Sequence, residues 1–443
     1  MKSMIKKGVC LLSMVMMAGT PLFAQSDSLN VSAAENGPKV LSVTLDEAKK
    51  YAVEHNRTIQ NASLDVQKAE ASRWKSIASM LLQVSGEVDY YNFFNHEMEM
   101  MGMSIAMPPY FNFGVNASFT VGGQQIVSVK VAKIAKEMSE IATGKTEQSV
   151  TSNIETSYVN ILALEDMVKL LEKNLANLDS VHKMTLNAVK VGAAEQNDAD
   201  QLAIQVASLK STVNSQKRTI EVLYNSIRLL TGLNADDEVI LTQTLTDVVN
   251  PGSILEVMNS DLDLNNNYDY QLQSVNTELS KKQVTLNKMA YVPTLTAFYS
   301  FAKKKYCSDE ETMDMSAPNT FGLTLNVPIW SSGSRWADVK SAKIDYEEAL
   351  NNMKDTEQQL GIQEKQLRYN LVSAYENHEI QSDNIEVMQR VFKSNSEKFK
   401  YGTISSMQLT TSSTDLISAQ NTYITALMDM ISAYVDLKVL LNK

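Results

Sequence analysis

Residues 206–230 read VASLKSTVNSQKRTIEVLYNSIRLL, and residues 416–440 read LISAQNTYITALMDMISAYVDLKVL. Both segments carry a series of residues separated by alternating steps of three and four, and all but one of these residues are apolar. The series are Val206, Leu209, Val213, Gln216, Ile220, Leu223, Ile227 and Leu230, and then Leu416, Ala419, Tyr423, Ala426, Met430, Ala433, Leu437 and Leu440. Such spacing predicts helices that pack along a coiled-coil seam for more than three heptads.

The positions of proline and glycine predict that these helices belong to long hairpins. No proline occurs between Pro109 and Pro251 or after Pro328, and proline disrupts helix interiors. Gly192 and Gly402 then supply turns. We expect helices at about 124–190, 196–231, 334–400 and 405–442, the longer ones reaching roughly 100 Å at ~1.5 Å per residue.

The two hairpins are related by an internal repeat. Gly192 and Gly402 differ by 210 positions (402 − 192 = 210), and so does every pair of seam residues. An earlier segment, Asn56–Met80, matches Asp269–Pro293 at an offset of 213. We therefore expect two repeats, at residues 25–232 and 268–443, joined by an equatorial linker at 233–267. Each repeat also begins with a helix, at about 45–82 and 268–291.

Four segments between the helices alternate apolar and polar residues. They lie at about 84–94, 110–122, 293–303 and 319–330, and each predicts a strand with one apolar face. A soluble four-stranded sheet and a membrane-spanning sheet both fit this pattern. A sheet in lipid cannot leave its edges open, so the spanning alternative requires several copies that close one barrel.

The first 24 residues have the features of a secretory signal peptide. Lys2, Lys6 and Lys7 precede an apolar run from Val9 to Ala18, which is too short to span a membrane. The mature chain would begin near Gln25 and would contain only one cysteine, Cys307, so we expect no intrachain disulfide bond.

The composition argues against several other functions. The net charge is −11, from 40 basic and 51 acidic residues, so nucleic acid is not an expected partner. His55, His96, His182 and His378 are scattered, and no hydrolase, zinc-protease or phosphate-loop motif occurs. We expect neither enzymatic activity nor a cofactor.

A methionine-rich segment lies in the predicted hairpin loop between the first two strands. Thioethers suit soft ions such as Cu(I), so Met98, Met100, Met101 and Met103 are candidate metal ligands. Methionine also forms flexible apolar surface without any ligand, so both interpretations stay open.

The order of these features resembles the outer-membrane efflux proteins of the TolC type, over essentially the whole mature chain. The similar motifs are Leu45-Asp46-Glu47-Ala48, Pro293 before a strand, Val327-Pro328-Ile329-Trp330 followed by Gly333, and the turns at Gly192 and Gly402. The resemblance implies an α+β membrane protein: a homotrimer with a 12-stranded β-barrel in the outer membrane of a Gram-negative bacterium and a periplasmic α-helical tunnel.

The resemblance also implies partners and a function. A periplasmic adaptor (membrane fusion) protein and an inner-membrane pump of the RND or ABC type would dock at the tunnel, and outer-membrane lipid would surround the barrel. The protein would be a passive exit duct for efflux or for type I secretion. The rival from another class is a periplasmic coiled-coil scaffold or adaptor without a pore.

The tip of the hairpins is the expected gate and adaptor contact. Its candidate residues are Gly192, Glu195, Asp198, Asp200, Gly402, Thr403, Ser405 and Gln408. The chain departs from the family pattern in the second repeat, where a basic residue and two acids of the gate are replaced by Ile404, Gln408 and Thr411. Met80 likewise stands where Pro293 stands in the other repeat.

Overall fold

The computed structural model describes residues 39–94, 97–100, 103–106, 108–307 and 318–443. The chain divides into two units, 1–39 and 40–443, and all the elements described below belong to the second. The expected signal peptide falls outside the described residues.

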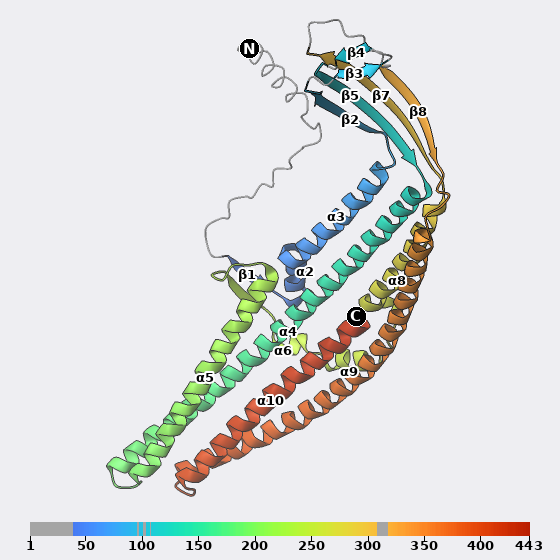
Figure 1. Ribbon diagram of the computed structural model, residues 1–443. Helices are drawn as coiled ribbons and strands as arrows, with labels where there is room; N and C mark the ends of the chain where they lie inside the picture. The colour runs from blue at the N-terminus through green and yellow to red at the C-terminus, as the bar shows by residue number, and fades with distance from the viewer. Residues whose placement is uncertain (1–38, 95–96, 101–102, 107, 308–317) are drawn as a thin grey trace, which may run out of the picture. The chain divides into compact units, whose positions relative to one another are not determined.

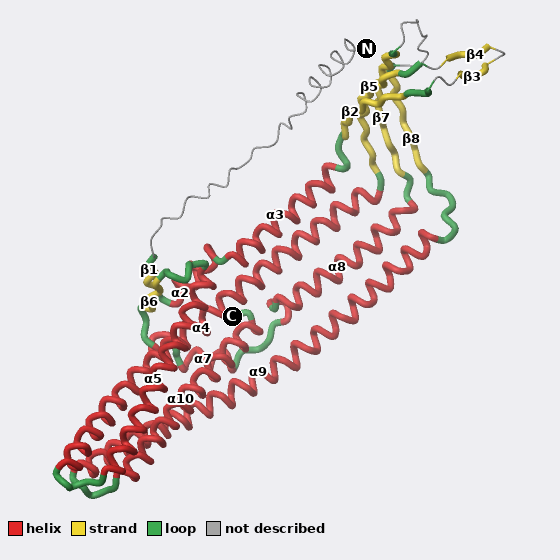
Figure 2. Tube along the Cα trace, turned by 60° about the vertical axis from the view of Figure 1, so that its left-hand side comes forward, coloured by secondary structure: helices red, strands yellow, loops and turns green. Residues whose placement is uncertain are grey.

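Two long helical hairpins make up most of this unit (Figure 1). Helix α4 (Gly123–Lys190, 68 residues) returns through α5 (Gln196–Thr231), and α9 (Ser334–Lys400, 67 residues) returns through α10 (Ser406–Leu441). The turns are made by Gly192 at φ 75° and Gly402 at φ 70°, a left-handed conformation that only glycine adopts readily. Both turns lie at the end of the unit opposite the strands (Figure 2).

Apolar side chains between the hairpins form an elongated core, and a second buried cluster joins the first hairpin to residues 43–59 and to Val239. All the seam residues are buried or partly buried, including Leu209 and Leu416. The largest fully buried side chains elsewhere in the same core are Leu171, Leu178, Leu202, Leu371 and Leu409. Burial of each such side chain stabilises the fold by about 1.5–3 kcal/mol, so the hairpins need no further cross-link.

Four antiparallel strands form a sheet at the other end. Their order is β2 (Gln83–Tyr91), β5 (Tyr110–Val121), β7 (Thr294–Tyr306) and β8 (Asn319–Asn326), so one strand pair from each repeat lies side by side. The central register sets Val115 of β5 opposite Gly86 of β2 and Phe301 of β7. A separate short hairpin, β3 (Glu97–Met100) and β4 (Met103–Ala106), lies between β2 and β5 in the chain.

The remaining elements lie around the middle of the helices. Strand β1 (Val40–Val43) pairs in parallel with β6 (Glu238–Leu241), and Val43 and Val239 are both buried there. The segment that we expected to be a linker, 233–267, contains β6, α6 (Leu245–Val248), α7 (Pro251–Met258) and the 3₁₀ turn η1 (Leu264–Asn266). Helix α8 (Tyr268–Lys288) and η2 (Met289–Tyr291) then lead to β7.

The expected single helix at 45–82 is wrong, because the chain forms two helices there. These are α2 (Leu45–His55) and α3 (Arg57–Ala78), and Asn56 between them has extended backbone angles, φ −66° and ψ 126°. The Asn56 side chain accepts hydrogen bonds from the amides of Thr58 and Ile59, so it starts a new helix. The expected strand at 319–330 is shorter, since β8 ends at Asn326 before Pro328, which has no N–H to donate.

Both repeats contain the same contact between two helices. An asparagine at the start of the helix that leads to the sheet, α3 or α8, contacts the C-terminal end of the return helix, α5 or α10. Asn56 donates to the carbonyl of Leu230 at 2.7 Å, and Asn267 donates to the carbonyl of Leu440 at 2.9 Å. Each asparagine also caps the helix that follows it. The offset here is 211 (267 − 56 = 211), so the offset of 213 inferred from the sequence is wrong by two positions in this segment.

Among the described residues, no helix has both the length and the apolar composition needed to cross a membrane.

Candidate functional site

The sheet has an apolar face and a polar face. Side chains alternate along each strand, and residues paired across strands share a face. The apolar face carries Val84 and Val88 of β2, Phe111, Phe113, Val115 and Phe119 of β5, Leu295, Tyr299 and Phe301 of β7, and Phe321, Leu323 and Leu325 of β8. Leu323 is 66% exposed and Val84 is 65% exposed, so this surface is uncovered in a single chain.

The polar face carries hydroxyls, amides and two carboxylates. Thr120 and Thr296 share a hydrogen bond of 3.0 Å, and Asn112 donates to Asp89 at 3.4 Å. Glu87 lies against Gly114, where an added Cβ would come within 2.8 Å of its side chain. On β8, Gly322 leaves room in the same way for the Phe298 ring of β7.

Both outer strands of the sheet have a free edge among the described residues. β2 pairs only with β5, and β8 pairs only with β7. Because the four strands alternate in direction, β2 and β8 run antiparallel to each other. A β8 edge of one copy could therefore continue the antiparallel pattern on the β2 edge of another.

Between the turns and the middle of the helices, three side-chain hydrogen bonds join the first hairpin to the second among the described residues. Ser406 of α10 donates to the carboxylate of Asp198 on α5. Farther from the turns, Gln205 donates to Thr414 at 3.0 Å. The third bond is buried: Asn174 of α4 donates to Gln420 of α10 at 3.1 Å, and the Gln420 amide nitrogen has no partner among the described residues.

The other predicted tip residues form local contacts. Glu195 precedes α5 but forms no side-chain cap, and Asp200 accepts from Gln196 at 2.8 Å. Thr403 donates to the carbonyl of Lys398, and Ser405 caps α10 by accepting from the amide of Gln408. Of the eight predicted residues, only Asp198 forms a side-chain hydrogen bond to the other hairpin within the described residues.

Apolar side chains are exposed beside both turns. Val191 is 79% exposed and Tyr401 is 84% exposed, and each directly precedes a turn glycine. Met407 is exposed nearby. These residues were not predicted from the sequence, although the 210-residue offset relates Val191 to Tyr401 and would have identified the pair.

A buried ion cluster that was not predicted from the sequence lies near the middle of the helices. Glu155 of α4 accepts from Lys49 of α2 at 2.6 Å and from Lys438 of α10 at 2.8 Å. Burial opposes ionisation of Glu155, but the hydrogen bonds from Lys438 and Lys49 outweigh it, so the pKa of Glu155 is lowered. The same contact raises the pKa of Lys438 against the effect of burial. The cluster thus links α2, α4 and α10 at one point.

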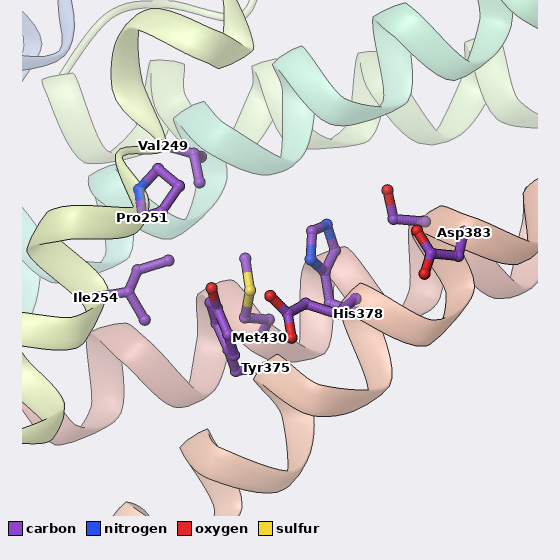
Figure 3. A pocket seen from close by; sticks show the side chains of 9 residues that line it. Val249, Pro251, Ile254, Tyr375, His378, Asp383 and Met430 are labelled. Carbon is purple, nitrogen blue, oxygen red and sulfur yellow. The ribbon is translucent and has the colours of Figure 1, made fainter. Parts of the chain in front are cut away.

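An open groove of about 490 Å³ lies between α9, α10 and the segment that contains α7 (Figure 3). Its lining combines His378, Glu379 and Asp383 of α9 with Pro251 and Ile254 of α7. Burial lowers the pKa of His378, which favours the neutral imidazole. Within the described residues, no three His, Cys, Asp or Glu side chains are grouped so as to hold a metal ion.

The methionine prediction is untested. Met101 lies outside the described residues, and the structure describes only the backbone of Met98, Met100 and Met103. These ligands therefore stay a prediction.

The chain is similar to one family of proteins and to several solved structures. The family model described as outer membrane efflux protein matches residues 50–233 and 260–443, one match per repeat. Among solved structures, CusC superposes with a TM-score of 0.74 at 17% identity, covering 90% of this chain and 92% of that one. VceC of Vibrio cholerae gives 0.72 at 13% identity, covering 90% and 95%.

The open-state MtrE outer membrane channel of Neisseria gonorrhoeae gives a TM-score of 0.67 at 15% identity, covering 90% of this chain and 88% of that one. At these identities the likeness establishes the fold. Comparison with proteins of curated function gave no significant match.

Proposed function

Because the chain belongs to the outer membrane efflux protein family, we propose that it forms the outer-membrane exit duct of a tripartite efflux or type I secretion system. The duct is passive, and an inner-membrane pump of the RND or ABC type supplies the energy. The observation that carries the proposal is the four-stranded sheet with one apolar face and two free edges, continued by hairpins whose longer helices have more than 60 residues each.

The free edges support assembly of several copies into a barrel. Unpaired backbone groups cannot face lipid, so β8 of one copy pairs with β2 of the next until the sheet closes. Three copies give 12 strands (3 × 4 = 12), which leaves an open lumen, whereas two copies would give an eight-stranded barrel filled by side chains. The apolar face then contacts outer-membrane lipid, and the polar face lines the lumen.

The same threefold assembly arranges the hairpins as a periplasmic tunnel. We also propose the domain boundaries expected from the sequence: a signal peptide at 1–24, one repeat at 25–232, a linker at 233–267 and a second repeat at 268–443. The hydrogen bonds between the two hairpins of each copy, Ser406 to Asp198 and Gln205 to Thr414, hold the tip narrow. Opening separates these hairpins, so the bonds act as part of the gate in place of the acids absent at Gln408 and Thr411.

The exposed apolar residues beside the turns support an adaptor contact. Val191, Tyr401 and Met407 are uncovered in the single chain, and burial of their apolar side chains against a partner would be favourable. The turns that contain Gly192 and Gly402 place them at the extremity of the unit (Figure 2). We infer that the periplasmic adaptor packs on these side chains.

Planar-bilayer recording tests the duct. The purified protein should migrate as a heat-modifiable trimer, fractionate with outer membranes and conduct ions, weakly in the closed state and strongly once the tip is loosened. A protein that stays in the soluble periplasmic fraction and shows no conductance, even with loosened tips, would instead be a coiled-coil scaffold. Deletion of the cognate pump or adaptor should abolish export without affecting the conductance of the purified protein.

A further inference from the structure

The distribution of charge over the sheet is uneven. On the polar face lie Glu87, Asp89 and Lys304. On the apolar face of the four described strands, the only charged residues are Lys303 and Lys305, both on β7. Charged groups are costly against hydrocarbon, so a pair of them on this face calls for a specific environment.

Both lysines lie at the end of the sheet that is far from the helices. β7 begins at Thr294, directly after α8 and η2, and Lys303–Lys305 come at its other end. In the duct, this end is the outer rim of the barrel. The lysines therefore lie at the level of the outer leaflet's headgroups, where their stems can cover apolar surface while the ammonium groups stay in a polar layer.

Aromatic residues surround the pair on the same face. The register sets Lys305 opposite Phe111 and Lys303 opposite Phe113. Next to them, the rings of Tyr90 and Phe111 are 4.9 Å apart between centroids, and those of Phe111 and Phe113 are 6.3 Å apart. Such rings are typical of the membrane–water interface, and they mark the depth of the two ammonium groups.

The two ammonium groups are exposed and available. Lys303 and Lys305 are exposed, and neither has an ion-pair or hydrogen-bond partner among the described residues. In contrast, Lys304 of the polar face is partly buried and lies over the Tyr110 ring at 5.4 Å. Residues two apart on one strand lie about 7 Å from each other, which allows two phosphates, or two groups of one headgroup, to be bound together.

We propose that Lys303 and Lys305, with Phe111 and Phe113 beside them on the neighbouring strand, form a binding site for the phosphates of a phosphorylated glycolipid in the outer leaflet. The site rests on the proposed function, since it requires the apolar face to lie in the outer membrane. It would anchor the outer rim of each protomer in the lipid layer. The lipid is recognised by charge at the headgroup and by aromatic contact with the acyl chains.

The test uses the full-length protein purified in detergent and titrated with diphosphoryl lipid A, with bound lipid counted by native mass spectrometry. Each lysine near an anionic surface is worth about a factor of five in affinity, so Lys303→Gln with Lys305→Gln should lower the affinity about thirtyfold. The wild-type affinity should also fall at high salt. The double arginine variant should keep the site, because it preserves both charges.

Lys304→Gln is the matched control, since it removes the same charge from the neighbouring position on the other face. It should leave lipid A binding unchanged. Equal affinity of the wild type and the double glutamine variant, an equal loss in Lys304→Gln, or equally tight binding of phosphatidylglycerol would each overturn the site.

Conductance in phosphatidylcholine bilayers without lipid A separates this proposal from the duct itself. The double glutamine variant should still conduct there. Wild-type conductance with no lysine-dependent lipid binding overturns the site alone. Failure of the wild type to insert overturns both proposals.

Discussion

The Glu155 side chain links three helices, α2, α4 and α10, through two ion pairs. Its carboxylate accepts from Lys49 and Lys438, and its side chain is only 11% exposed. Replacing it with glutamine leaves two lysines facing each other without a counter-charge. Since an uncompensated buried charge is strongly destabilising, Glu155→Gln should lower the free energy of unfolding by about 3 kcal/mol at pH 7. Chemical denaturation followed by circular dichroism measures this.

Glu172→Gln is a control on the same helix, because the Glu172–Lys217 pair is about half exposed and should contribute less than about 1 kcal/mol. Acid provides a second control. The folded pKa of Glu155 lies below its ordinary value of 4.5, so its contribution is complete above pH 4.5 and is lost as the pH falls through the folded pKa. An unchanged difference between wild type and Glu155→Gln well below that pH would contradict the ionic explanation.

Asn56 and Asn267 have the same two functions in the two repeats. Each caps the helix that leads to the sheet, α3 or α8, and donates to a carbonyl at the end of a return helix, α5 or α10. Alanine at either position removes the cap and leaves a buried carbonyl unpaired, so each variant should lose about 2–3 kcal/mol of stability. Aspartate should restore only the cap, because it cannot donate. Denaturant midpoints measure all four variants.

Asn250→Ala provides the comparison for a cap without the second bond. The exposed Asn250 accepts from the amide of Gly252 only, so its loss should cost about 1 kcal/mol. If Asn56→Ala cost no more than Asn250→Ala, the bond to Leu230 would have no energetic role.

The tip hairpins provide the prediction at the scale of elements. Among the described residues near the turns, only Asp198 and Ser406 form a hydrogen bond between a carboxylate and a hydroxyl group that joins α5 to α10. A hydrogen bond to a charged group contributes about 1.5–3 kcal/mol, so Asp198→Ala should raise the open population, and the single-channel open probability, at least about tenfold. Ser406→Ala should have the same effect, and the double variant no more, because both remove one bond.

Asp200→Ala controls for loss of tip charge. Its carboxylate accepts from Gln196 on its own helix, so the variant should keep the wild-type open probability. Equal opening by Asp198→Ala and Asp200→Ala would mean that charge repulsion, and not the link between hairpins, governs the tip.

Features set by local sequence spacing were predictable, whereas contacts set by the packing of distant segments were not. Heptad spacing is local, and it predicted that Leu209 and Leu416 face a neighbouring helix, where both are buried. Asn174 and Gln420 pair across 246 positions, and that contact depends on the mutual register of two hairpins. The break at Asn56 was missed because the flanking sequence has continuous helical periodicity, and only the cap interrupts it.

The family and the general architecture of the molecule were predictable from the sequence, but the contacts between its distant segments were not. The resemblance to TolC-type proteins is confirmed by the family match to both repeats. Of the tip residues, Asp198 alone was both predicted and found in a contact between hairpins, since a sequence indicates turns but not the partners across them. The cluster around Glu155 was missed because its three members come from helices far apart in the chain.

The orientation of the sheet in the membrane provides a prediction for the whole assembly. Val115 and Asn116 are neighbours near the middle of β5, which is paired on both sides, so neither lies at a free edge. Arginine at position 115 would face lipid, where it costs about 2–4 kcal/mol near the midplane. Arginine at position 116 would face the water-filled lumen. Val115→Arg should therefore reduce the heat-modifiable trimer in outer membranes severalfold, whereas Asn116→Arg should assemble normally and shift the conductance toward anions. Gel mobility of membrane fractions and reversal potentials in a salt gradient measure the two effects.

The two variants also distinguish the alternative arrangements of the sheet. A soluble sheet with both faces in water would tolerate the two arginines alike. A barrel of the opposite orientation would instead lose assembly in Asn116→Arg and keep it in Val115→Arg, so the pair distinguishes all three arrangements.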